Sequence, residues 1–244
     1  VGPAIMLSIL FAASATFGLL EYFAQILMVA SLDFSSLVFP GILSVIAVAI
    51  YWFRFRVPFA MALIALGLFG VSLLAAAAQV GAPKSLSDVF VFSGQGPFGW
   101  ITLALGLAVF AVAMVFDGSD PYRVTRRASQ GFWLHVVAAP AIVNSVALSL
   151  LASESSLART ALVAFLGLIA LVAIVIDRRS FLMAAIGYSI TLGTAAIAQN
   201  NIAWMILALG IGMVVLGAGW ERIRAVLLNA LPLGNLRRFL PPSA

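Results

Sequence analysis

Runs of about 20 apolar residues recur along this chain, and they constrain its fold more than any other feature. A run of that length crosses the hydrocarbon core of a bilayer, which is roughly 30 Å thick. Only 9% of the residues are charged, against about 25% in an ordinary soluble domain. The chain therefore has too few polar residues to cover the apolar core of a water-soluble protein. Since lipid offers the backbone no hydrogen bonds, each run must be a helix. The sequence therefore predicts an all-α integral membrane protein.

The apolar runs divide into eight predicted transmembrane helices. They cover 4–29, 36–53, 58–80, 98–116, 131–152, 160–176, 181–198 and 202–220. Most of the connections are short. The exception is 81–99, whose glycine and proline content favours a loop over another span.

The basic residues are distributed unevenly between the two sets of connections. If the spans alternate in direction, only Lys84 and Arg159 fall on one side, and all the other basic residues fall on the opposite side. By the positive-inside rule the arginine-rich side is cytoplasmic, and an even number of spans places both termini there. The predicted cytoplasmic basic anchors are Arg54, Arg56, Arg123, Arg126, Arg127, Arg178, Arg179, Arg222 and Arg224.

The two halves of the chain share a sequence pattern. Trp100 opens the run Trp-Ile-Thr-Leu-Ala-Leu-Gly, and Trp204 opens the run Trp-Met-Ile-Leu-Ala-Leu-Gly. In the same alignment Asp117 meets Glu221, so both spans end on an acid. The pattern predicts tandem duplication of a four-helix unit, which repeats in the same orientation. Coincidence in an alphabet dominated by alanine, leucine, valine and isoleucine is the alternative.

The predicted duplication divides the chain into four parts. Residues 1–116 are the first four-helix membrane repeat, 117–130 a basic cytoplasmic connector, 131–220 the second repeat, and 221–244 a basic amphipathic cytoplasmic tail. Arginines alternate with apolar residues in the tail, which is typical of a segment lying on an anionic membrane surface. An ordinary solvated tail is the alternative.

Polar residues inside the predicted spans are the candidates for function. Glu21 is the one acid well inside a span, where a carboxylate is costly and by default a functional candidate. Gln25 lies at helical spacing on the same face. Glu21 would bind a cation or a proton, or pair with another subunit. The alternatives are a structural glutamate within the bundle, or a shifted span that places Glu21 near the membrane surface.

His135 is the only histidine, so it cannot form a two-histidine haem site or a zinc site alone. It is a weak candidate for a ligand to a chlorophyll-type pigment or for a proton shuttle. An interfacial or hydrogen-bonded side chain is the favoured interpretation, and a direct pair with Glu21 is not expected. Asn144, Tyr188 and Thr191 complete the intramembrane polar candidates, and close helix packing explains them better than a substrate path. We expect no metal and no cofactor, whereas bound lipid is expected and a pigment stays open.

Several motifs resemble those of a family of uncharacterised bacterial multi-pass inner-membrane proteins. They are the run Asp120-Pro-x-Arg-x-Thr-Arg-Arg leading into Phe132-Trp-Leu-His, the turn Asp177-Arg-Arg, and the proline-rich ending after Trp220. The resemblance covers mainly 117–242. It implies a bacterial inner-membrane protein with several spans, but no activity and no site residues, because that family has none assigned.

Two functions remain open from the sequence. The first is a non-enzymatic accessory, scaffold or assembly subunit of a larger respiratory or photosynthetic membrane complex, with other integral membrane subunits as partners. Small loops and scarce intramembrane polar groups favour it. The second is a small-solute or ion transporter or channel built from two parallel repeats. We find no phosphate-binding or hydrolase motif, so no enzyme is predicted. The basic residues lie at helix ends, as membrane topology requires, so the net charge of +5 does not predict a nucleic-acid binder.

Overall fold

The computed structural model describes residues 2–30, 34–92, 96–153, 155–178, 202–232 and 234–242. Helices dominate this part of the chain, and it contains no strand. The long helices are α1 (Gly2–Ala30), α2 (Phe34–Phe55), α3 (Ala60–Val80), α4 (Phe98–Gly118), α5 (Arg126–Leu151), α6 (Ser156–Val175) and α8 (Ile202–Ala230), and two short 3-10 helices are η1 (Leu86–Val89) and η3 (Gly234–Phe239).

Six of the described helices, α1 to α6, are long and apolar enough to cross a membrane. They confirm a helical protein of membrane type with several spans. The predicted span at 181–198 lies outside the described residues, so the number eight and the duplication stay predictions. Two predicted boundaries differ from the structure. The fifth helix begins at Arg126, inside the predicted connector, and α8 runs on to Ala230 without a break at Trp220.

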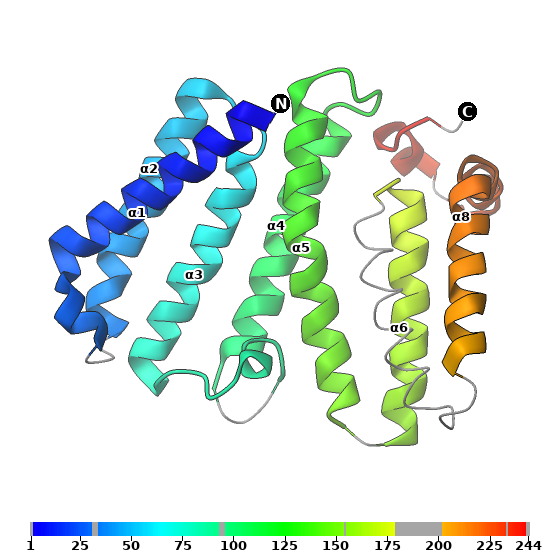
Figure 1. The fold of residues 1–244 in the computed structure, drawn as a ribbon. Helices are drawn as coiled ribbons and strands as arrows, with labels where there is room; N and C mark the ends of the chain where they lie inside the picture. The colour runs from blue at the N-terminus through cyan, green and yellow to red at the C-terminus, as the bar shows by residue number, and fades with distance from the viewer. Residues whose placement is uncertain are drawn as a thin grey trace.

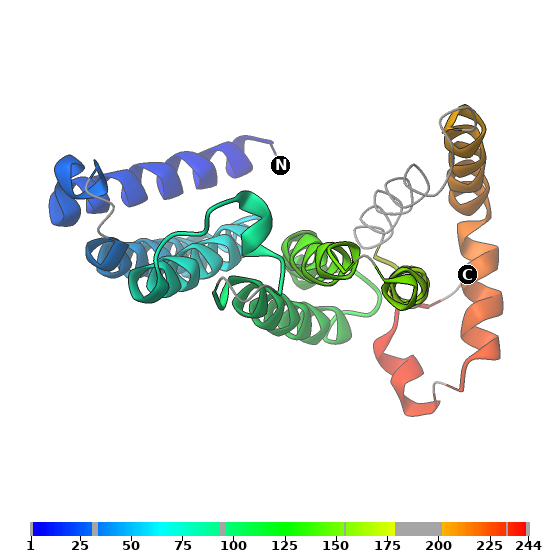
Figure 2. The same cartoon turned by 90° about the horizontal axis from the view of Figure 1, so that it is seen from below.

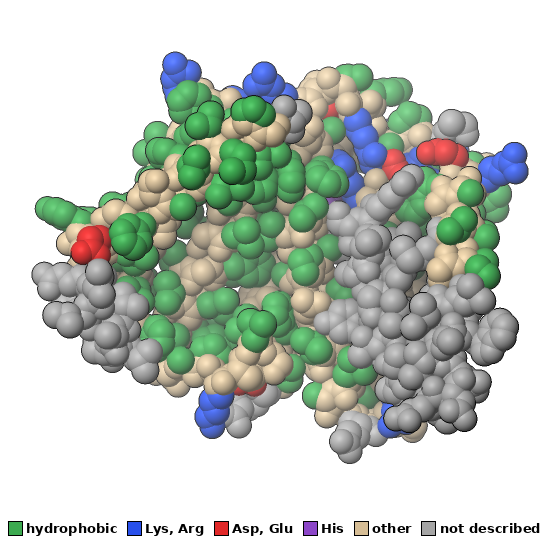
Figure 3. All heavy atoms as spheres, viewed as in Figure 1, with side chains coloured by type: hydrophobic (Ala, Val, Ile, Leu, Met, Phe, Trp, Pro, Cys, Tyr) green, Lys and Arg blue, Asp and Glu red, His purple; other side chains and the backbone are tan. Residues whose placement is uncertain are grey.

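Successive helices lie beside one another in an elongated row (Figures 1 and 2). Adjacent helices in the row pack in the pairs α1–α2, α2–α3, α4–α5 and α5–α6. Helices α2, α4 and α6 finish at the end of the molecule where α3 and α5 begin, and we call this the basic end. Both termini lie near it in Figure 1, and most visible lysine and arginine side chains gather there in Figure 3. This clustering agrees with the alternation predicted from the arginines.

The core is centred on α5, whose buried residues are mostly small. Ala138, Ala139 and Val143 are completely buried there. Opposite them on α4, a Cβ on Gly106 would come within 3.0 Å of Ala141 and Ile142. Small residues let two backbones approach closely, which is how helices gain packing energy in lipid. The α4–α5 pair is therefore the rigid centre from which the basic end is built.

The loop from 81 to 97 is anchored at the opposite end. Its η1 turn carries a capping box, in which the Ser85 N–H donates to the Asp88 carboxylate at 2.9 Å. Thr102 on α4 donates to the Val89 carbonyl, and the Phe92 N–H donates to Ser149 on α5. The loop is thus fixed to the central pair where it is described.

Candidate functional site

A buried carboxylate, Asp117, organises the basic end. It lies in the last turn of α4, where the helix dipole disfavours a negative charge, and it is only 7% exposed. Arg178, just after α6, compensates it by donating from Nε to Oδ2 at 2.9 Å and from Nη2 to Oδ1. Arg178 also donates to the Ala128 carbonyl on α5. One ion pair therefore joins three helices.

His135 is the third member of this buried group. Its Nε2 lies 2.9 Å from Oδ2 of Asp117, and the side chain is fully buried. The ring also stacks edge-to-face with Phe110 on α4. The interpretation of His135 as a hydrogen-bonded residue fits this geometry. The carboxylate beside it is Asp117 and not Glu21.

A glycine makes room for the pair. Gly131 faces the Asp117 side chain, and a Cβ there would lie 3.1 Å from Cγ of Asp117 and closer still to its Oδ1. It would also lie 3.3 Å from the Ala113 carbonyl oxygen. A larger residue at 131 must displace a carboxylate that two other side chains hold in place.

A second ion pair lies beside the first. Arg123, in the α4–α5 turn, binds Asp177 at 2.7 Å and donates to the Asp177 carbonyl. Burial lowers the pKa of Arg123, and the carboxylate of Asp177 opposes that shift. Trp220 on α8 donates its indole N–H to Oδ1 of Asp177 at 2.7 Å. Asp177 therefore links α6, α8 and the α4–α5 turn.

Asp177 also closes the end of α6 in an unusual way. Its φ is 57°, a left-handed conformation that glycine normally supplies. The N–H of Arg178 bonds to the Ala173 carbonyl and the N–H of Asp177 to that of Ile174, which is a Schellman motif. An aspartate costs more than glycine at this position. Its contacts with Arg123 and Trp220 explain why a side chain is present.

The α4–α5 turn is held by Asp120. Its carboxylate accepts hydrogen bonds from the N–H groups of Val124 and Thr125 and from the Thr125 hydroxyl, at 3.2, 2.8 and 2.7 Å. The bond from the Thr125 side chain is the main cause of a lowered pKa at Asp120. Thr125 in turn caps α5 by accepting from the Arg127 N–H. This capping explains why α5 begins earlier than its apolar run.

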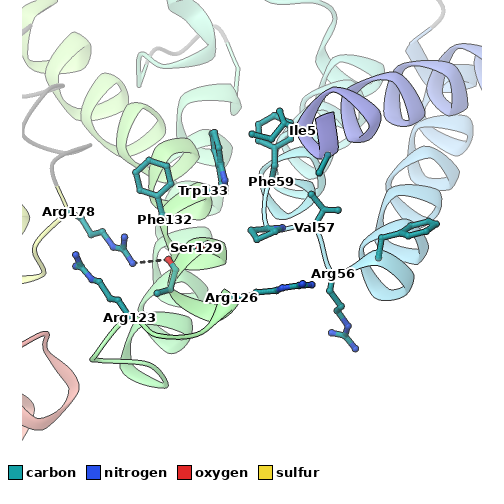
Figure 4. A pocket seen from close by; sticks show the side chains of 14 residues that line it. Ile5, Arg56, Val57, Phe59, Arg123, Arg126, Ser129, Phe132, Trp133 and Arg178 are labelled. Atoms are coloured by element: carbon teal, nitrogen blue, oxygen red, sulfur yellow. Dashed lines mark hydrogen bonds between the residues drawn. The ribbon is translucent and has the colours of Figure 1, made fainter. Parts of the chain in front are cut away.

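A cavity of about 670 Å³ opens beside these ion pairs, between α1, the α2–α3 turn and α5. Four arginines line it: Arg56, Arg123, Arg126 and Arg178. In Figure 4, Arg123 and Arg178 lie side by side, and Arg126 reaches toward the α2–α3 turn. The rest of the wall is largely apolar and includes Ile5, Val57, Phe59, Phe132 and Trp133. The cavity therefore combines positive charge with an apolar surface.

The other sequence candidates lie apart from this site. Glu21 is exposed on α1, nine residues before the helix ends at Ala30, and it lines neither this cavity nor the one between α1, α2 and α3. Gln25 lies in α1, and Asn144 is half-buried in α5. Tyr188 and Thr191 lie outside the described residues.

Two of the predicted anchors have a different environment from the one expected. Arg178 is 6% exposed and Arg224 is 1% exposed, so neither is a solvated surface charge. Arg224 donates to the carbonyls of Pro241 and Pro242, which ties α8 to the C-terminal segment. Arg54, Arg56, Arg126, Arg127 and Arg222 are exposed, as an anchoring role requires, and Arg179 lies outside the described residues.

Sequence reasoning missed the partners Asp117 and Asp177. The sequence does indicate that these residues lie at a similar depth in the membrane. Asp117 ends one predicted span, His135 lies about one turn into the next, and Arg178 follows a span that ends on the same side. Charges at one depth on neighbouring helices are expected to pair, because an uncompensated buried charge is costly.

The chemistry of the cluster is that of a buried ion-pair network. The Asp117 carboxylate is shared by Arg178 and His135, and the imidazole is buried beyond the reach of a solute. Across the described ranges, no group of three or more His, Cys, Asp and Glu side chains is placed to hold a metal. No family model, curated protein or solved structure matches the chain.

Proposed function

We propose that this protein is a non-enzymatic accessory or scaffold subunit of a larger membrane complex. In this proposal it spans the bacterial inner membrane with both termini on the cytoplasmic side, and the basic end faces the cytoplasm. Its partners are integral membrane proteins of a respiratory or photosynthetic assembly. Bound lipid is expected, and no catalytic group is assigned.

The open arrangement of the helices carries this proposal. In the most apolar 18-residue stretch of α1, 6% of the residues are buried, against 56% in the corresponding stretch of α5. Large apolar side chains project along α1 from Met6 to Phe23, among them Met6, Leu10 and Phe17, which are 58%, 57% and 68% exposed. Although α1 packs on α2, its other faces are left uncovered by the described helices. Packing against helices of another subunit would give it the van der Waals contacts that helix association in lipid requires.

The buried cluster supports the same interpretation. Its charged side chains bind one another across α4, α5, α6 and α8. His135 and Asp117 are buried, so a substrate could not reach them. Since a buried ion pair is weak evidence for stability, we infer that these pairs fix which helices pack together. A tightly packed centre with a largely uncovered first helix is suited to docking.

Co-purification tests the proposal. We would solubilise the tagged protein in mild detergent, identify co-purifying proteins by mass spectrometry and record an absorption spectrum of the eluate. The expected result is stoichiometric recovery with the subunits of one membrane complex. A colourless monomer or homodimer that carries no other subunit would overturn the proposal.

A pair of variants sharpens the test. Leu10→Trp adds bulk to the exposed face of α1, and Val115→Trp adds bulk to an exposed site on α4, where Val115 is 72% exposed. Fluid lipid accommodates either change, whereas a packed helix interface does not. We expect the α1 variant alone to lose the partner subunits. Equal recovery with both variants would remove α1 as the docking element.

Transport is the second candidate from the sequence. It requires Glu21 and the hydroxyl groups of 181–198 to converge on a cavity between two repeats. Glu21 is exposed on α1 and lines neither of the two cavities described above, and the hydroxyl-rich span lies outside the described residues. The described geometry therefore favours the subunit proposal.

A further inference from the structure

We propose that the cavity at the basic end binds the headgroup of one anionic glycerophospholipid, with the start of its acyl chains against the apolar wall. This inference depends on the protein lying in a bilayer, and it does not depend on which complex the protein joins. It assigns a ligand of defined chemistry to a defined place between α1, the α2–α3 turn and α5.

The four arginines of the cavity wall differ in whether a carboxylate of the protein already binds them. Arg123 is paired with Asp177, and Arg178 is paired with Asp117. Arg56 and Arg126 make no ion pair with any carboxylate in the described part of the chain. Both are exposed and border the same cavity.

The geometry of these two arginines suits a phosphate. Arg126 reaches toward the α2–α3 turn, which carries Arg56 (Figure 4). The Arg56 guanidinium lies over the rings of Trp52 and Phe53, at 4.7 Å from each centroid, and points out of the cavity. A rotation of that one exposed side chain would turn its guanidinium toward the cavity that Arg126 also lines. Arginine binds phosphate through paired N–H groups.

The opposite wall argues for a lipid over a soluble anion. Ile5, Phe59 and Phe132 line it and offer no side-chain hydrogen-bond donor. Trp133 packs edge-to-face on Phe59, and tryptophan is the residue enriched where lipid headgroups meet the hydrocarbon core. A hydrated anion gains nothing from such a wall, whereas the glycerol and upper acyl chain of a lipid are covered by it.

Size and position agree with this ligand. The volume of about 670 Å³ lies within the 300–1,000 Å³ of small-molecule sites. The cavity lies at the helix ends, where α2 finishes and α5 begins. The α5 N-terminus is already capped by Thr125 and Asp120, so the arginine side chains are the binding groups.

Two double variants test the site with equal changes of charge. Arg56→Gln with Arg126→Gln removes the two unpaired charges of the cavity. Arg54→Gln with Arg127→Gln removes two exposed arginines that are near neighbours in the sequence but do not line the cavity. The purified proteins are delipidated, titrated in detergent with phosphatidylglycerol or phosphatidylcholine, and examined by native mass spectrometry.

The expected result is one phosphatidylglycerol per chain, preferred over phosphatidylcholine. Two arginines near a lipid headgroup predict a loss of affinity of about 30-fold in the cavity variant, and no comparable loss in the matched control. Equal losses in both variants would show diffuse surface attraction and overturn the proposal. So would the absence of a preference for phosphatidylglycerol.

A second measurement separates a lipid from a free phosphate and does not depend on the arginine variants. Phosphatidylglycerol brominated near the start of its acyl chains should quench the fluorescence of Trp133. The quenched component should disappear in Trp133→Phe, which keeps the packing on Phe59. Inorganic phosphate should neither quench nor displace the lipid. Displacement by phosphate, or quenching unchanged in Trp133→Phe, would contradict a lipid in this cavity.

Discussion

The substitution Gly131→Ala separates helix propensity from the geometry of the buried cluster. Inside a helix, replacing glycine by alanine is normally stabilising by about 1 kcal/mol. At 131, the new Cβ would lie 3.1 Å from Cγ of Asp117 and 3.3 Å from the Ala113 carbonyl oxygen. The carboxylate cannot swing away without leaving Arg178 and His135.

The magnitude follows from these opposing effects. Disrupting a buried ion pair costs about 3–5 kcal/mol when one charge is left uncompensated. Subtracting the gain in propensity leaves a net destabilisation of about 2–4 kcal/mol. Gly167→Ala in α6 is the matched control, because a Cβ there meets nothing within 4 Å. It should be neutral or stabilising by up to about 1 kcal/mol.

The assay is reversible unfolding in mixed detergent micelles, followed by tryptophan fluorescence. In an Asp117→Ala background the obstacle is gone, so Gly131→Ala should lose its penalty, which a double-mutant cycle measures as coupling. A Gly131→Ala protein as stable as the wild type would refute the placement of Asp117 against Gly131. A penalty that persists without the Asp117 side chain would assign it to the backbone contact with Ala113.

Three further predictions concern the same end of the molecule. Asp117→Asn keeps the shape of the side chain but removes the charge opposite Arg178, so it should lower the free energy of unfolding by about 3–5 kcal/mol. Glu221→Gln, at the aligned exposed position, should change it by less than about 0.5 kcal/mol. Similar values for the two variants in the same unfolding assay would argue against the buried pair. The hydrogen bonds to Asp120 hold its pKa below the usual value, so its stabilising contribution is complete above the unfolded pKa of about 3.9 and is lost as the pH falls through the folded value. The difference in stability between wild type and Asp120→Asn should therefore shrink on acidification, and a difference independent of pH would count against this role. Trp220→Phe removes the indole donor to Asp177 and should lower the free energy of unfolding by about 1.5–3 kcal/mol, as for hydrogen bonds to charged groups. Trp100→Phe, at a position 57% exposed, should change stability little. A larger loss in Trp100→Phe than in Trp220→Phe would contradict the hydrogen bond between Trp220 and Asp177.

The helical class and most span positions could be predicted from the sequence, because run length and hydropathy decide them. The predicted span 98–116 corresponds to α4, and 58–80 corresponds to α3. The ends were less predictable, since a helix continues past its apolar run wherever capping permits. Thr125 and Asp120 start α5 at Arg126, and α8 continues to Ala230 through a charged stretch.

The candidate site was harder to predict than the spans. Hydropathy gives the depth of a residue but not which helix lies beside it. Asp117 and Arg178 are 61 residues apart, and nothing local in the sequence marks them as partners. The motif around Asp177 was visible as a turn, whereas its left-handed backbone and its contacts with Arg123 and Trp220 depend on tertiary packing.

The separation of Asp117 from its arginine has a consequence for how the chain is made. The imidazole of His135 follows Asp117 by 18 residues, and the guanidinium of Arg178 follows it by 61. At synthesis rates of 5–20 residues per second, the second interval lasts roughly 3–12 s. During that time the part of the chain already made contains Asp117 and its histidine but not its arginine. Completion of α6 is therefore the step that neutralises the centre, and a chain halted before Arg178 would present an unfinished, acid-bearing hairpin to the quality-control machinery of the membrane.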